Sequence, residues 1–149
     1  MENLINENSP ANSNDMTSQE ICVISYNSRG FNEMKQSFTR FLTSDKVVGN
    51  KIPILCNQEN FLLRGNFHKI LKAIPGFHVF INLDKGRPKG GMFIAVPDSL
   101  KNNVADASPG HWRIQAITID LGSTKTLLIN TYFPCDSGQL TGGNVEEAF

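Results

Sequence analysis

Three polar residues stand where apolar runs of the sequence end. Asn27 follows ICVISY, Glu59 follows IPILCNQ, and Tyr132 follows TLLINT. They bring together an amide, a carboxylate and a phenol, groups that bind ligands through hydrogen bonds and, for the carboxylate, can hold a cation. Polar side chains at the carboxyl ends of parallel strands meet at one rim of a sheet, which is the usual place for a ligand.

Each of these residues also has a simpler interpretation. Glu59 can be the first solvated residue of a loop, because most strands end in polar residues. Asn27 can be a turn residue, since asparagine tolerates a left-handed backbone and bonds to its own turn. Tyr132 can be an ordinary core aromatic of a strand. The types of these three residues do not decide between the interpretations.

The elements that would position them follow a βαβα pattern over residues 21–74. The first and second strands are expected at residues 21–27 and 51–57, and their apolar runs are typical of strands covered on both faces. One helix is expected after an N-cap at Asn32. A second is expected after a cap at Asn66, with Phe67, Ile70, Leu71 and Ile74 on its buried face. This order predicts parallel strands joined by helices.

The second half of the chain has a different pattern. Strands are expected at residues 77–83, 91–96, 112–122 and 126–133, the last two forming a hairpin around Gly122. We expect these strands to add antiparallel pairs to the sheet.

Composition narrows the class of protein. The chain has 149 residues, 40% of them hydrophobic, and fourteen basic residues balance fourteen acidic ones, so it has the length of one domain and no overall attraction to polyanions. No apolar run is long enough to cross a membrane. Cys22, Cys56 and Cys135 have no metal-binding spacing, and the N-terminus has no signal sequence. A reducing compartment, the nucleus or the cytoplasm, fits best.

A basic loop, KGRPKGG, offers a local site for a polyanion. It carries Lys85, Arg87 and Lys89 beside glycines, so it could contact a DNA backbone through charge and exposed amides, or it could be a solvated turn. The three histidines, His68, His78 and His111, lack the spacing of metal ligands.

Five segments in order resemble the endonuclease/exonuclease/phosphatase superfamily, most closely the endonuclease domain of non-LTR retrotransposons. The segments are ISYNSRGF, ILCNQENFL, KGRPKGGMFIAV, WRIQAITIDL and LLINTYFPCD, and they span residues 20–137. The resemblance implies Mg²⁺-dependent hydrolysis of phosphodiester bonds, with DNA as the partner of the intact family. It implies that Glu59, in the Q-E motif, is the metal carboxylate, and that Asn27 and Tyr132 contact the phosphate.

The superfamily completes its site with a later G-D-x-N motif and a terminal S-D-H motif. Neither is present, Asp120 and Asp136 do not match them, and no histidine follows His111. The attacking water would therefore lack a base. We expect the first half of a nuclease domain over residues 20–137, after a disordered leader over residues 1–19 and before a truncated tail over residues 138–149. Alone, it should be inactive and bind Mg²⁺ weakly or not at all.

The resemblance also implies a fold class: α/β (α+β), the first half of a two-sheet sandwich flanked by helices, with a mixed sheet and two helices on one face. We expect the other face of that sheet to be open, because its partner sheet would come mainly from the absent half. An exposed apolar face favours association. The alternative function is therefore a non-catalytic module that self-associates, binds a protein partner or binds nucleic acid weakly.

Overall fold

The structure is a computed structural model that describes residues 19–62, 64–82 and 91–133. Three of the regions discussed above fall outside the described residues. They are the leader apart from Gln19, the loop with Lys85, Arg87 and Lys89, and the tail over residues 138–149.

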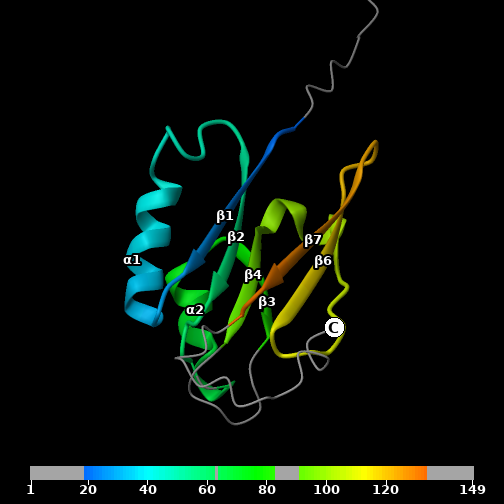
Figure 1. The fold of residues 1–149 in the computed structure, drawn as a ribbon. Coiled ribbons are helices and arrows are strands. Elements are labelled where there is room, and N and C mark those ends of the chain that lie inside the picture. The colour runs from blue at the N-terminus through cyan, green and yellow to red at the C-terminus, as the bar shows by residue number, and fades with distance from the viewer. Residues whose placement is uncertain (1–18, 63, 83–90, 134–149) are drawn as a thin grey trace, which may run out of the picture.

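The first sheet is mixed, as predicted. Its four strands, in the order β1-β2-β4-β3, are β1 (Ile21–Asn27), β2 (Ile52–Gln58), β4 (Met92–Pro97) and β3 (Phe77–Asn82). Strands β1 and β2 run parallel, and β4 runs antiparallel to both of its neighbours. The βαβ crossover through the first helix therefore places the carboxyl ends of β1 and β2 at the same end of the molecule (Figure 1).

Two helices, α1 (Phe31–Leu42) and α2 (His68–Ala73), cover one face of this sheet, as expected. Met34 and Phe38 from α1 and Ile70 from α2 are fully buried. They pack in one apolar cluster with side chains of the sheet: Ile24, Leu55, Phe93 and Ala95. Burial of this apolar area is what holds the helices on the sheet.

The helix starts differ from the predicted ones. Helix α1 is preceded by Gly30, whose φ of 142° few other residues adopt, and Asn32 lies inside its first turn. A 3₁₀ turn, η1 (Arg64–Asn66), occupies the predicted cap of α2. Ile70 and Ile74 are buried as predicted, but Phe67 and Leu71 are exposed instead of joining the core.

Strands β3 and β4 add antiparallel pairs to the first sheet, as predicted. The later strands form a separate sheet, which corrects the prediction that they too extend the first. Strands β5 (Val104–Asp106), β6 (Ile114–Asp120) and β7 (Lys125–Thr131) pair antiparallel, after a 3₁₀ turn, η2 (Asp98–Asn103). Ile117 and Ile119 of this sheet pack on the second face of the first sheet. Their partners there are Ile54, Cys56, Ile94 and Val96.

The face that was expected to be open is therefore covered across β2 and β4. The physical reason is visible in β2, where Ile54 and Cys56 face one side and Leu55 the other, so both faces need an apolar cover. The result is part of a two-sheet sandwich with helices on one outer face, as the predicted fold class requires.

Burial also changes the acidity of one cysteine, Cys56. Loss of solvent raises the pKa of the Cys56 thiol to about 12, so the thiol stays protonated near neutral pH. Within the described part of the chain, no helix is long and apolar enough to span a membrane.

Candidate active site

The three candidate residues lie at one rim of the sandwich. The arrowheads of β1, β2 and β7 point to the same end of the molecule in Figure 1. Asn27, the last residue of β1, pairs with Gln58, so Glu59 follows directly beside it. Tyr132 comes immediately after β7. The structure thus brings Asn27, Glu59 and Tyr132 to one edge from three strands and two sheets.

Glu59 and Tyr132 are in direct contact across the two sheets. The Tyr132 hydroxyl donates a hydrogen bond to the Glu59 carboxylate oxygen Oε1, and both residues are half-buried. The backbone N–H of Tyr132 is held by the carbonyl of Arg113 at 3.0 Å, which continues the pairing of β6 and β7. The carboxylate is therefore held in a fixed position at the rim.

The backbone at this rim is strained. Glu59 has a φ of 55°, and Arg29 and Phe61, which flank the same edge, have φ values of 49° and 56°. A left-handed backbone costs a residue other than glycine about 1–2 kcal/mol. Such residues are found at ligand sites more often than elsewhere, because the surrounding fold must hold them in place.

Asn27 is exposed, and its side chain supports the turn that follows. Its oxygen Oδ1 accepts a 3.3 Å hydrogen bond from the backbone N–H of Arg29. This is the local bond of a turn asparagine. The amide nitrogen Nδ2, which can donate hydrogen bonds, takes no part in that bond.

Beneath the rim lies a buried amide network that was not predicted from the sequence. Gln58 Nε2 donates to Asn130 Oδ1 and, at 3.2 Å, to Ser25 Oγ. Asn130 Nδ2 in turn donates to the carbonyls of Asn57 and Phe93 at 3.2 and 3.3 Å. Gln58 and Asn130 come from different sheets, so this network locks the sheets together directly below Glu59.

A second branch of the network fixes the loop after β1. Asn57 Nδ2 donates to Ser28 Oγ at 3.0 Å, and Ser28 Oγ donates to the Gln58 carbonyl at 3.2 Å. Asn57, Gln58 and Asn130 are almost fully buried. Their signal in the sequence is the presence of amide side chains within otherwise apolar strands, since buried polar groups must find partners.

Comparison with known proteins supports the fold. No protein-family model and no curated protein sequence matches the chain. Among solved structures, the AP endonuclease LMAP from Leishmania major aligns over 75% of this chain and 40% of its own, with 16% identity and a TM-score of 0.55. The endonuclease domain of TRAS1, a telomere-specific non-LTR retrotransposon, aligns over 87% and 50%, with 16% identity and a TM-score of 0.49.

Over the aligned residues the chain shares the fold of the AP endonuclease LMAP. This confirms the resemblance at the level of fold. The chain spans 40% to 50% of the length of these two structures.

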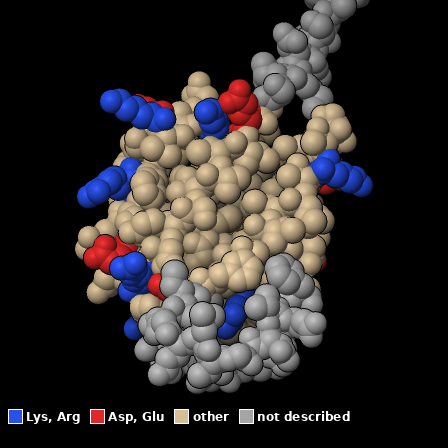
Figure 2. All heavy atoms as spheres, in the orientation of Figure 1, with Lys and Arg blue, Asp and Glu red and all other residues tan. Residues whose placement is uncertain are grey.

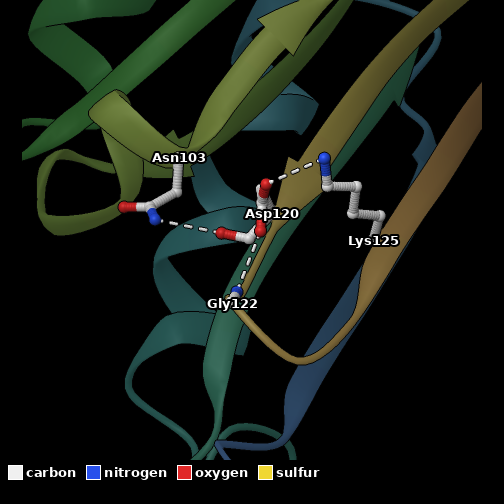
Figure 3. A network of polar contacts seen from close by, with 4 residues as sticks. All are labelled: Asn103, Asp120, Gly122 and Lys125. Carbon is white, nitrogen blue, oxygen red and sulfur yellow. Dashed lines mark hydrogen bonds and ion pairs between the residues drawn. The ribbon is translucent and has the colours of Figure 1, made fainter.

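Asp120, which does not match the missing superfamily motifs, pairs with Lys125 at the opposite end of β6 from the rim. Figure 3 shows its polar contacts. Its carboxylate accepts a 2.9 Å bond from the Gly122 N–H and lies 3.5 Å from the Lys125 ammonium, while its carbonyl accepts from Asn103 at 3.0 Å. The Gly122 bond, with help from Lys125, lowers the pKa of Asp120. Asp120 thus stabilises the β6–β7 hairpin and is not part of the rim.

The rim offers the type of ligand that Mg²⁺ prefers, but too few such ligands to hold the ion. The Glu59 carboxylate is a hard oxygen ligand, and sites that hold Mg²⁺ on phosphates often use one or two carboxylates. Among the described residues, no group of three His, Cys, Asp or Glu side chains could hold a metal ion. The chemistry fits, and further ligands would have to come from elsewhere.

An aromatic and cationic stack, formed by His111, Trp112 and Arg113, stands next to Tyr132. The Arg113 guanidinium carbon lies 4.4 Å from the centroid of the Trp112 ring, and His111 stacks on the same ring at 6.1 Å. Neither this stack nor its position at the rim was predicted from the sequence. The Arg113 backbone carbonyl accepts the hydrogen bond from the Tyr132 N–H, so this stack begins one residue-pair across the sheet from Tyr132.

Proposed function

We propose that the chain is part of a magnesium-dependent phosphodiesterase domain that acts on DNA in the nucleus or cytoplasm. The observation that carries this proposal is the bond between the Tyr132 hydroxyl and the Glu59 carboxylate, beside Asn27, on this superfamily's fold. This observation supports the proposal because the Glu59 carboxylate, the Tyr132 hydroxyl and the Asn27 amide lie at one rim of the sandwich.

In this proposal each residue has a separate role. Glu59 holds Mg²⁺, which would polarise the phosphate when bound. The Tyr132 hydroxyl and the Asn27 amide donate hydrogen bonds to phosphate oxygens, where negative charge builds up during hydrolysis. Lys85, Arg87 and Lys89, which lie outside the described residues, are proposed contacts to the DNA backbone.

The 149-residue chain alone is expected to show no Mg²⁺-dependent nicking of supercoiled plasmid DNA. The reason is that its sequence supplies neither the second carboxylate nor the base of the G-D-x-N and S-D-H motifs. The superfamily resemblance implies that both motifs lie in the part of LMAP beyond the aligned region, so a fusion of that part to this chain should nick DNA until EDTA is added. Nicking by the unfused chain that is lost in Glu59→Ala, or an inactive fusion that unfolds cooperatively, would contradict the proposal.

A second candidate function, a non-catalytic interaction module, is favoured by an exposed apolar surface on β7. Leu128 and Asn130 of β7 face the core, so Leu127 and Ile129, 57% and 53% exposed, face outward. Charged side chains lie around the margin of the face shown in Figure 2, and its centre, over β1 and β7, is uncharged. This surface replaces the open face of the first sheet that the sequence predicted.

If this surface drives self-association, the double variant Leu127→Thr/Ile129→Thr should be monomeric at concentrations where the parent chain forms larger species. Its stability should change little, because exposed substitutions usually change stability by less than about 0.5 kcal/mol each. Analytical ultracentrifugation would measure the difference, with Thr118→Ser/Thr126→Ser as the control on the same sheet. Equal sedimentation of parent and double variant would remove this candidate.

A further inference from the structure

A groove between the two helices carries a concentration of positive charge. It has a volume of about 190 Å³ and is lined by residues of both helices: Phe31, Lys35, Lys69, Lys72 and Ala73. Three of these five side chains are lysines, in a chain whose net charge is zero. Although the whole chain has no net charge, this part of its surface is therefore strongly basic.

These lysines are not neutralised by neighbours within the described part of the chain. The ion pairs found there join Lys51 to Glu20 and Lys125 to Asp120, at other places on the surface. Glu33, the acidic residue in the first turn of α1, does not line the groove. A second concavity along α1 continues from Lys35 to Arg40 and is also lined by uncharged polar residues: Asn32, Gln36 and Thr39.

The groove begins close to the rim. Helix α1 starts four residues after Asn27, and Phe31, its first residue, lines the groove. Helix α2 follows Glu59 after the short turn η1 (Arg64–Asn66). In Figure 1, α1 begins at the end where β1 and β2 finish, so a chain of phosphates crossing the rim could continue along the helices.

We propose that this groove binds the phosphate backbone of DNA, as an extension of the rim on the helical side of the molecule. This proposal rests on the proposed function, because the path of the DNA from the rim into the groove assumes that the rim acts on DNA. Lysine binds phosphate as a compact point charge. The three lysines come from two helices, so each can contact a different phosphate along the DNA backbone. Phe31, at the end of the groove nearest the rim, adds an aromatic surface against which a sugar or base can pack.

Fluorescence anisotropy of the 149-residue chain with a short labelled DNA duplex tests the groove without requiring catalysis. Lys35→Gln/Lys69→Gln/Lys72→Gln should weaken binding about tenfold or more. It should also make the slope of log affinity against log salt shallower by about 2.7, because each lost phosphate contact removes about 0.9. The matched control is Lys46→Gln/Lys51→Gln/Lys101→Gln, which removes the same charge from exposed sites outside the groove.

The salt slope should stay within experimental error in the control. Equal losses in the two triple variants would show a general charge effect and overturn the proposal, as would an unchanged slope in the groove variant. A groove variant that has lost its parent's circular dichroism spectrum would be replaced by the single variants, each expected to change the slope by about 0.9.

If groove-dependent binding persists while the LMAP fusion is inactive, the proposed function falls and the groove stands. An active fusion whose DNA binding does not depend on the groove lysines would overturn the groove and leave the proposed function standing.

Discussion

Replacing Glu59 by Gln in the fusion with LMAP is expected to lower Mg²⁺-dependent plasmid nicking by roughly a thousandfold. The substitution removes the charge that would hold the metal. It preserves a side-chain oxygen that can accept the hydrogen bond from the Tyr132 hydroxyl, so the contact between the two sheets survives. The melting temperature without Mg²⁺ should therefore remain nearly unchanged, which separates a metal ligand from a structural residue.

Glu33→Gln is the matched control for this experiment. Glu33 is exposed on α1 and undergoes the same chemical change away from the rim, so nicking should persist. Full activity of the Glu59→Gln fusion would remove Glu59 from the site. A large fall in its melting temperature would show instead that the carboxylate serves the fold.

The second large effect concerns stability. Asn130→Ala is expected to lower the free energy of unfolding of the chain by about 3 kcal/mol, because a buried group left without its partner costs about 1–3 kcal/mol. The substitution leaves Gln58 Nε2 without its Asn130 acceptor and the carbonyls of Asn57 and Phe93 without the Asn130 donor. Urea unfolding followed by circular dichroism measures the change, provided the transition is two-state.

Thr131→Ala is the neighbouring control. Thr131 is exposed on the opposite face of β7, so its truncation should cost well under 1 kcal/mol. A similar small loss in Asn130→Ala would mean that water replaces the amide easily, and that the network does not hold the sheets together. Nicking by the fusion should fall along with stability in Asn130→Ala, since the network positions Glu59.

The layers of the fold could be predicted from the apolar pattern. The continuous run around Ile54 indicates a strand buried on both faces, and that is where β2 lies, between the helices and the second sheet. Met34 and Phe38 share one face of a helical period, and that face packs on the sheet. These features follow from local spacing, which the sequence displays directly.

Features that depend on distant partners could not be read in this way. An alternating pattern shows that Ile117 and Ile119 face a core, but it does not show that their strand belongs to a separate sheet. The bond between Gln58 and Asn130 joins residues 72 positions apart. The start of α1 at Phe31 depends on the backbone of Gly30, whose φ is 142°. The sequence offered Asn32 as the cap and did not show this conformation.

The candidate site was partly predictable for a related reason. Asn27 and Glu59 end parallel strands, and strand order alone places their ends together. The contact of Tyr132 with Glu59 depends on how the second sheet crosses the first, which no local pattern encodes. The buried amides beneath the rim show only as polar interruptions of apolar runs, and their geometry comes entirely from packing.

The most direct test of the rim as a metal site is paramagnetic broadening by Mn²⁺, a substitute for Mg²⁺, in the isotope-labelled fusion. We expect the backbone amide resonances of Asn27, Glu59 and Tyr132 to broaden first as Mn²⁺ is added, and this selectivity to disappear in Glu59→Gln. Broadening that spares the rim, or that centres on the Asp120 hairpin at the other end of β6, would contradict the proposal that the rim is a metal-dependent active site.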